Sequence, residues 1–207
     1  MGNTMIIKMA YQKFIQAAAL HYKQHSSVMA QTMCDLLSSI EITNSPSSST
    51  VNSNSKPTFT IDSHAVLQDI VTSNFHPLLT SLEDCYHSLA WRPSGFGKLP
   101  PQITNHVAVV EIIGPSGMIE DPRFRFGLLL QDPEVLYAKH QHAAEELYLV
   151  LNGKAAWSVD DNKARPREVG EFIYHAENQP HQMKTNDEPL LAMWAWLGDI
   201  DAESYSI

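Results

Sequence analysis

Histidine and glutamate side chains gather in one short stretch of the second half of the chain. His140 and His142 are two residues apart, and Glu146 follows them closely. On a β-strand, residues two apart point to the same face, so the two imidazoles can point together, and Glu146 and Tyr148 form a second such pair if residues 143–145 make the turn. Neutral imidazole and carboxylate suit a divalent transition metal and leave coordination positions open for a substrate. The stretch therefore predicts a metal site.

One more ligand has to come from elsewhere in the chain. His181 is the preferred candidate, because Gly170 precedes an expected strand at 171–175 and the Pro180-His181 step returns the chain to the same face. His175 is the alternative. The remaining histidines have no other candidate ligands near them in the sequence, and we interpret them as structural. They are His21, His25, His64, His76, His87 and His106.

The elements that would position these residues are short strands. After about residue 105 apolar residues recur at every second position, as at 124–130, and turn signals recur at Gly114-Pro115, Asn152-Gly153 and Asp160-Asp161-Asn162. No long helical pattern interrupts them. We therefore expect residues 105–207 to form a mainly β domain, an antiparallel sandwich or barrel.

Residues 1–104 are expected to form a helical N-terminal extension. Apolar residues with helical spacing predict one helix over about 5–42 and a second over about 63–90, with Ser63 as its N-cap and Pro77 as a point where it bends or divides. The Ser/Asn-rich segment 43–57 between them is too polar to bury and predicts a flexible loop. The Gly- and Pro-rich segment 91–101 predicts an ordered connection or a lid over a pocket.

The composition narrows the class of protein. The 207 residues include 14 Lys and Arg against 23 Asp and Glu, a formal net charge of −9, and no basic block offers a footprint for nucleic acid. We expect no nucleic-acid partner. No signal peptide and no apolar run of the roughly 18–20 residues that span a bilayer is evident, so we expect a cytoplasmic protein without a membrane partner. Cys34 and Cys85 lack any metal-binding spacing and predict buried, reduced thiols.

The His-x-His-x3-Glu pattern at 140–146, followed by Gly170 and His181, resembles the two metal-binding motifs of the cupin superfamily. The resemblance implies that the mainly β domain is a cupin double-stranded β-helix, a jelly-roll barrel. The second motif departs from the usual pattern, because His175 stands where a proline is common and Thr185 where an asparagine is frequent.

A narrower resemblance covers about Trp91 to Asp199. This part is similar to the bacterial dimethylsulfoniopropionate (DMSP) lyases of the cupin type, and Tyr148, after the motif glutamate, is the distinguishing residue. The matching stretches are GLLLQ at 127–131, YAKHQHAAEELYLVL at 137–151, PHQMKT at 180–185 and WAWLGD at 194–199.

The resemblance implies a carbon–sulfur lyase that eliminates dimethyl sulfide from DMSP and leaves acrylate. Iron, zinc or manganese at His140, His142, Glu146 and His181 would bind the substrate carboxylate and stabilise negative charge as the proton leaves. Tyr148 is implied as the base or as a metal ligand that substrate displaces. Tyr137 is the second candidate base or a carboxylate anchor.

The sulfonium of DMSP is a permanent cation, and cations bind well over aromatic faces. Trp194 and Trp196 share one face of an expected strand, so either is a candidate for the sulfonium pocket. Trp91 and Phe96 are candidates for closing that pocket and excluding water.

Two rival functions remain open at this point. The same ligand set would serve another metal-dependent cupin enzyme, a dioxygenase or an isomerase, that acts on a small organic acid. A non-enzymatic cupin sensor is the other rival. A homodimer is compatible with sheet edges and amphipathic helices, although no residue identifies an interface.

Overall fold

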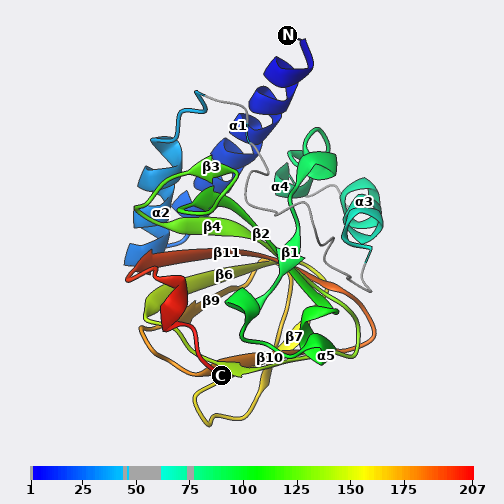
Figure 1. The fold of residues 1–207 in the computed structure, drawn as a ribbon, viewed down its shortest axis with the longest axis vertical. Coiled ribbons are helices and arrows are strands. Elements are labelled where there is room, and N and C mark those ends of the chain that lie inside the picture. Colours follow the sequence, from blue (N-terminus) through cyan, green and yellow to red (C-terminus); the bar gives the residue numbers. More distant parts are fainter. Residues whose placement is uncertain (1, 44–45, 47–61, 74–76) are drawn as a thin grey trace. The chain divides into compact units, whose positions relative to one another are not determined.

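The computed structural model describes residues 2–43, 46, 62–73 and 77–207 (Figure 1). The chain divides into two compact units, one of residues 1–49 and 64–89 and the other of residues 50–63 and 90–207. The first unit is helical and the second is mainly β. The units divide at Leu89 and Ala90, earlier than the 104/105 division that the change of period suggested.

The helix expected over 5–42 is two helices, so that prediction was wrong. α1 spans Gly2–Lys23 and α2 spans Val28–Ser38. Ser27 interrupts them because it is extended (φ −69°, ψ 148°) and its side chain accepts a hydrogen bond from the N–H of Ala30 at 3.2 Å. Serine in this position satisfies one of the backbone donors that a helix start leaves without a partner.

The second expected helix, over about 63–90, corresponds to two described helices on either side of residues 74–76, which lie outside the described residues, and the α-helix does not continue beyond Thr80. α3 spans Ser63–Ser73, and α4, Pro77–Thr80, begins at the proline, whose fixed φ suits a first helical position. A 3-10 turn, η1, follows at Tyr86–Ser88. The loop predicted at 43–57 lies outside the described residues except for Thr43 and Pro46.

The helical unit has its own apolar core. Phe14, Met33 and Leu78 are among its fully buried side chains. The Tyr11 hydroxyl lies 3.1 Å from the hydroxyl of Ser88 and ties the first helix to the last turn of the unit. Both cysteines lie in this unit and are reduced, with Cys85 buried and Cys34 partly exposed.

The second unit is built from two sheets whose strands are antiparallel, apart from the short parallel pair β2–β3. The larger sheet has the order β1-β2-β4-β11-β6-β9, with β3 beside β2, and the smaller has the order β5-β10-β7-β8. The strands of the larger sheet are β1 Arg92–Pro93, β2 Val107–Gly114, β3 Ile119–Glu120, β4 Arg125–Gln131, β6 Ala144–Asn152, β9 Phe172–His175 and β11 Leu190–Gly198. Those of the smaller sheet are β5 Leu136–His140, β7 Ala155–Val159, β8 Arg165–Arg167 and β10 His181–Thr185.

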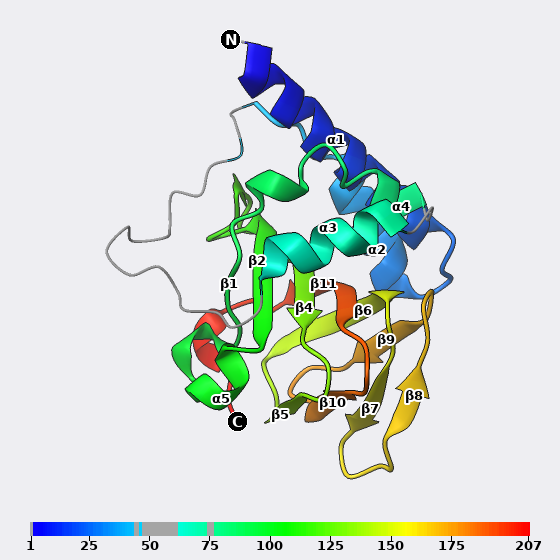
Figure 2. The same ribbon diagram turned by 90° about the vertical axis from the view of Figure 1, so that its right-hand side faces the viewer.

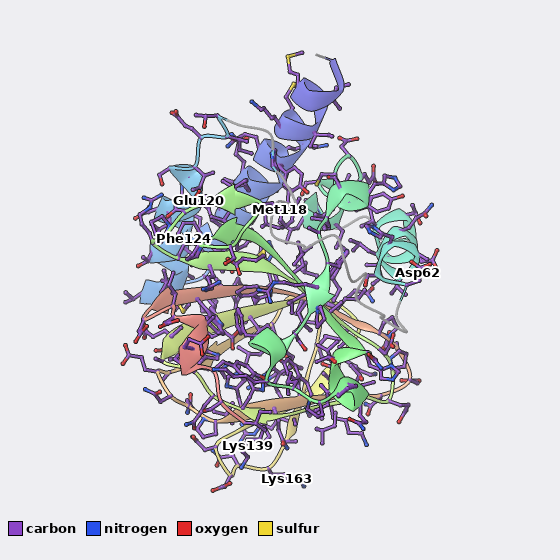
Figure 3. All side chains as sticks on the ribbon, viewed as in Figure 1. Asp62, Met118, Glu120, Phe124, Lys139 and Lys163 are labelled. Carbon is purple, nitrogen blue, oxygen red and sulfur yellow. The ribbon has the colours of Figure 1, made fainter. Side chains whose placement is uncertain are left out.

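The two sheets enclose one core (Figure 2). Trp157 and Met183 of the smaller sheet pack in the same buried cluster as Tyr148 and Trp194 of the larger. Figure 3 shows side chains crowding this interior, whereas Lys139 and Lys163 project from the barrel into solvent. The expectation of a mainly β, antiparallel barrel is confirmed.

The connection expected at 91–101 lies in the barrel unit as β1 and a 3-10 turn, η2, Gly95–Gly97. α5, Pro101–Thr104, follows it. Phe96 has a left-handed conformation (φ 51°, ψ 34°) between two glycines that also have positive φ. A phenylalanine rarely adopts this conformation, so the turn holds the ring in a fixed direction at some cost in backbone energy. Among the described residues, none of the helices combines the length and hydropathy needed to cross a bilayer.

Candidate metal centre and substrate pocket

Strand register brings the candidate site residues together. His140 at the end of β5 is the direct cross-strand partner of His181 at the start of β10. Glu146 of β6 lies opposite His175 of β9 on one side and Trp196 of β11 on the other. Three separate strand pairings therefore deliver these side chains to one place in the barrel.

Glu146 is the centre of the cluster. Its Oε2 lies 3.2 Å from Nε2 of His142, 3.1 Å from Nε2 of His181 and 3.2 Å from Nδ1 of His175. Burial would raise the pKa of Glu146, but the charge and hydrogen bond of a protonated His142, with further hydrogen bonds from His175 and His181, hold it well below its usual value. The carboxylate is therefore ionised although it is fully enclosed.

Three of the four predicted ligands form a tight group. Ligand atoms of His142, Glu146 and His181 all lie within 4.8 Å of one another. His140 lies beside this group rather than in it, with its ring centroid 4.2 Å from that of His181. His175 stacks on His181 at 3.8 Å between centroids, and burial lowers its pKa to about 4, so it is neutral at physiological pH.

Backbone carbonyls fix the orientation of the predicted histidine ligands. The Nδ1 atoms of His140, His142 and His181 lie 2.8, 3.0 and 2.9 Å from the carbonyl oxygens of residues 138, 144 and 179. A carbonyl oxygen only accepts hydrogen bonds, so each Nδ1 carries the proton. Each Nε2 of a neutral ring then presents a lone pair, as in most metal-ligating histidines.

This arrangement fits a divalent metal. If His142 and His181 are neutral, their Nε2 lone pairs face the negatively charged Oε2 of Glu146 at 3.2 and 3.1 Å. Acceptors at such distances repel one another unless a cation lies among them. A neutral His181 carries its proton on Nδ1, so its buried Nε2 can only accept, and it has no hydrogen-bond donor as a partner in the part of the chain that the structure describes. Buried polar atoms of this kind require a partner.

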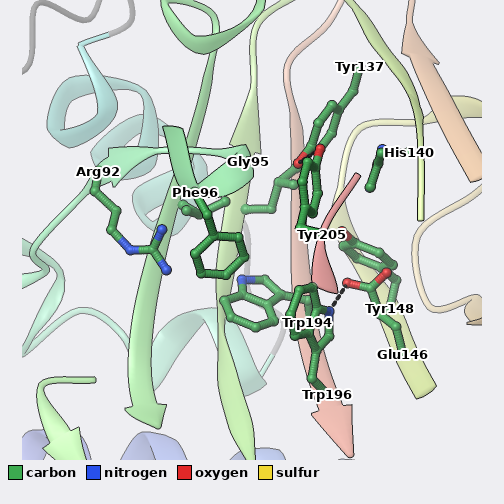
Figure 4. A pocket seen from close by; sticks show the side chains of 12 residues that line it. Arg92, Gly95, Phe96, Tyr137, His140, Glu146, Tyr148, Trp194, Trp196 and Tyr205 are labelled. Atoms are coloured by element: carbon green, nitrogen blue, oxygen red, sulfur yellow. Dashed lines mark hydrogen bonds between the residues drawn. The ribbon is translucent and has the colours of Figure 1, made fainter. Parts of the chain in front are cut away.

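The pocket beside the cluster has a volume of about 380 Å³, counting its open mouth (Figure 4). Six predicted residues line it: Tyr137, His140, Glu146, Tyr148, Trp194 and Trp196. His142 and His181 are not among the lining residues. Phe96 lines the pocket as predicted for a closing residue, whereas Trp91 is buried but is not part of the wall.

The pocket tyrosines are protonated as the site stands. Burial, with the nearby charge of Glu146, raises the pKa of Tyr148 well above its usual value. Burial also raises the pKa of Tyr137 to about 12, although the hydroxyl of Tyr205 donates a hydrogen bond to it at 3.3 Å. A cation would have to lie close by for either tyrosine to act as a base at neutral pH.

Arg92 and Tyr205 line the pocket and were not predicted from the sequence. Tyr205 follows the turn η3, Ala202–Ser204, and reaches the pocket because Ser206 pairs with Gln141 through two backbone hydrogen bonds of 2.9 Å. Lys98 holds the same segment by donating to the carbonyl of Tyr205 at 2.9 Å. Neither residue belongs to a recognisable motif, so only tertiary contacts identify them.

Trp196 has a role that the sequence did not suggest. Its indole N–H donates to Oε1 of Glu146 at 2.7 Å, the contact drawn as a dashed line in Figure 4. The hydrogen bond leaves Oε2 of Glu146 directed at the histidines. Trp196 therefore orients the candidate ligand in addition to lining the pocket.

Two antiparallel sheets closed around a buried His/Glu cluster define the class of protein, a cupin. Within that class, the family model of dimethylsulfoniopropionate lyase matches residues 25–192, and the chain belongs to this family.

Individual relatives agree with the family assignment. The dimethylsulfoniopropionate lyase DddQ of Ruegeria pomeroyi is 28% identical over 112 residues, which are 54% of this chain and 56% of the relative. The chain matches about half the length of its curated relatives. A chain from crystal structures of the DMSP lyases RdDddP and RnDddQII is 25% identical, with a TM-score of 0.57 over 69% of this chain and 76% of that one. The crystal structure of R. pomeroyi DddQ, at 21% identity and a TM-score of 0.56 over 70% of this chain and 77% of that one, shares the fold.

Proposed function

We propose that this protein is a metal-dependent DMSP lyase that cleaves dimethylsulfoniopropionate to dimethyl sulfide and acrylate by β-elimination. The observation that carries the proposal is that Tyr148, Tyr137 and Glu146, all within the family-matched residues, lie in the wall of one pocket. In the reaction a base removes a proton from the carbon next to the carboxylate. The electrons form the new carbon–carbon double bond, and the carbon–sulfur bond breaks with its electron pair leaving on dimethyl sulfide.

His140, His142, Glu146 and His181 are the proposed metal ligands. The Nδ1 contacts with backbone carbonyls support three of them, because they leave each Nε2 free to coordinate. Bound iron, zinc or manganese would act as a Lewis acid, stabilising the charge that develops on the substrate carboxylate and favouring the phenolate form of a nearby tyrosine. The donor set accepts several divalent ions, so the metal identity stays open among these three.

Tyr148 is the proposed base. It lies in the pocket wall, two residues along β6 from Glu146 and on the same face, which brings its hydroxyl near the candidate metal centre. The phenol oxygen would take the substrate proton as the carbon–sulfur bond breaks. Tyr137 is the second candidate for the base and otherwise an anchor for the carboxylate, with Tyr205 holding its hydroxyl.

The aromatic wall supports binding of a sulfonium ion. The rings of Trp194 and Trp196 lie 6.0 Å apart between centroids, and Phe96 lies 5.6 Å from Trp196. Such faces attract cations and exclude water from the region where the proton is transferred.

A cytoplasmic location and a homodimer stay predictions from the sequence.

The test is headspace gas chromatography for dimethyl sulfide, with acrylate measured in the same samples. Purified protein is treated with EDTA and reloaded with iron, zinc or manganese in turn. We expect equal amounts of the two products, release that depends on metal, and a loss of about 10²-fold or more in Tyr148→Phe, as is usual when a general base is removed.

Tyr174→Phe is the matched control. Tyr174 is half exposed on β9, and its hydroxyl donates a hydrogen bond to Glu145 rather than facing the pocket. This variant should therefore keep full activity. Failure to release dimethyl sulfide with any of the three metals would overturn the proposal. Oxygen consumption during turnover would instead favour the dioxygenase alternative.

A further inference from the structure

Arg92, Arg125 and Glu111 form a cluster of charges at the end of the pocket opposite the candidate metal centre. Nη2 of Arg92 and Nη1 of Arg125 lie 3.0 and 2.7 Å from the same carboxylate oxygen, Oε2 of Glu111. The other oxygen of Glu111 accepts the backbone N–H of Ser116 at 3.0 Å. Within the described residues no second carboxylate is in ion-pair contact with either guanidinium, so the cluster carries one surplus positive charge.

The two arginines are not equivalent. The Arg125 side chain is 6% exposed, and its Nε also donates to the carbonyl of Ile200 at 2.9 Å, so this arginine is held by protein groups. The Arg92 side chain is 27% exposed and lines the pocket. Its guanidinium carbon lies 4.8 Å from the centroid of the Phe96 ring, which fixes the direction of the group. The surplus charge is therefore presented to the pocket by Arg92.

A second donor without an acceptor lies in the same wall. Trp194 lines the pocket and is 5% exposed, and its indole nitrogen is buried without a hydrogen-bond partner among the described residues. An indole N–H can only donate, and a buried donor without an acceptor is unfavourable. In Figure 4 the nitrogen of Trp194 is on the side of its ring that faces Phe96, and Arg92 and Glu146 are at opposite sides of the pocket.

We propose that Arg92 and the indole N–H of Trp194 form a carboxylate-binding subsite, separate from the candidate metal centre. Both groups are pure donors, and one surplus charge matches a singly charged anion. A planar carboxylate can accept from a guanidinium and an indole N–H at once, and the aromatic walls suit the short apolar chain of a small organic acid. Neither group belongs to the metal centre, so the proposal does not depend on lyase activity. Because the charge of Arg92 beside Phe96 repels another cation, the subsite leaves Trp196, and not Trp194, as the candidate for the sulfonium.

Nuclear magnetic resonance of the full chain without metal tests the subsite. The protein is labelled with 15N, treated with EDTA and titrated with propionate at constant ionic strength. The chain has 4 tryptophans, so the indole signals are few, and Trp194→Phe assigns the one that matters. We expect the Trp194 signal to shift in a saturable manner with propionate, and not with the neutral analogue propionamide or with the same concentration of chloride.

Variants separate the subsite from general charge effects. Arg92→Met should weaken propionate binding by at least about tenfold, because a charge-assisted hydrogen bond is lost. Arg123→Met is the control, since Arg123 pairs with Asp121 and is half exposed; binding should be unchanged. If Arg92→Met does not fold, two other variants replace it: Arg92→Lys keeps the charge but loses the guanidinium, and Trp194→Phe removes the second donor. Calorimetric titration should show that both bind propionate more weakly.

A Trp194 signal that does not respond to propionate, or one that shifts equally in the Arg92 variants or with chloride, would overturn the proposal. Absence of dimethyl sulfide in the turnover assay would leave the titration result unaffected, because the titration needs neither metal nor turnover. The two proposals therefore fail separately.

Discussion

At the scale of single residues, hydrogen bonds to backbone carbonyls orient most of the candidate metal ligands. Three histidines donate Nδ1–H to carbonyl oxygens of their own neighbourhoods, and Trp196 holds one oxygen of Glu146. Orientation is therefore fixed before any ligand arrives, which lowers the entropy lost on binding.

Removing His181 should weaken metal binding. Its Nε2 is one of the ligand atoms within 4.8 Å of one another, so we expect His181→Ala to lower zinc affinity by at least about 100-fold in calorimetric titration. His175→Ala should have a smaller effect, because His175 contacts Glu146 and stacks on His181 but contributes no ligand atom to the group.

His106→Ala is the control for both variants. His106 pairs with Asp132 at 2.8 Å, away from the cluster, and its loss should leave zinc affinity unchanged. Equal losses in His175→Ala and His181→Ala would show that His175 is itself a ligand.

Glu111→Gln should destabilise the barrel strongly. The carboxylate is 1% exposed and is the acceptor for two guanidinium groups, so the substitution leaves the buried Arg125 and the partly exposed Arg92 with a neutral partner. We expect a loss of about 3 kcal/mol or more in the free energy of unfolding measured with urea. Glu120→Gln, on the exposed residue of β3, should change it by less than about 0.5 kcal/mol. A similar small effect for both would contradict the ion-pair argument.

At the scale of elements, the paired strands β2 and β4 leave no space for a side chain at Gly127. A Cβ on this residue would lie 1.8 Å from the carbonyl oxygen of Val110, next to the register shift between Glu111 and Ile113. Gly170 differs, because its φ is +89° but nothing lies within 4 Å of the added Cβ.

Gly127→Ala should therefore cost more stability than Gly170→Ala. We expect about 3 kcal/mol or more for the steric overlap at Gly127 and about 1–2 kcal/mol for the left-handed conformation at Gly170. Urea unfolding followed by tryptophan fluorescence measures both. A smaller loss of stability for Gly127→Ala than for Gly170→Ala would mean that β2 and β4 can move apart at Gly127 without destabilising the barrel.

Local patterns predicted the elements better than the details of the site. Period-two apolar residues predicted the antiparallel strands, and the spacing of the histidine–glutamate motif predicted that His142 and Glu146 lie together, because both depend on neighbours in the chain; His140 lies beside that group and stays a predicted ligand. The break at Ser27 was missed, since a helical apolar pattern continues on both sides of it. Arg92 and Tyr205 reach the pocket through contacts between distant segments, which spacing in the sequence cannot reveal.

At the scale of the whole molecule, each unit encloses a core of its own. Phe14 and Leu37 are fully buried in the helical unit, and Tyr148 and Trp157 are buried in the barrel. The candidate metal ligands all belong to the barrel unit. Metal binding is therefore expected to stabilise one unit directly.

Unfolding should consequently depend on the probe. Circular dichroism at 222 nm reports mainly α1, α2 and α3, whereas fluorescence reports the barrel, and we expect two transitions that do not coincide. Metal at about 100 times its dissociation constant should stabilise only the fluorescence transition, by about 2.7 kcal/mol. Coincident curves with and without metal would show that the units unfold as one.

The distribution of sulfur and indole between the units has a practical consequence. Both thiols lie in the helical unit, and all of the tryptophans, at 91, 157, 194 and 196, lie in the barrel unit. A dye attached to the partly exposed Cys34 can accept resonance energy from the barrel without any engineered donor. The efficiency of energy transfer from the tryptophans to this dye therefore reports the distance between the units in solution, and any change in that distance when a ligand binds.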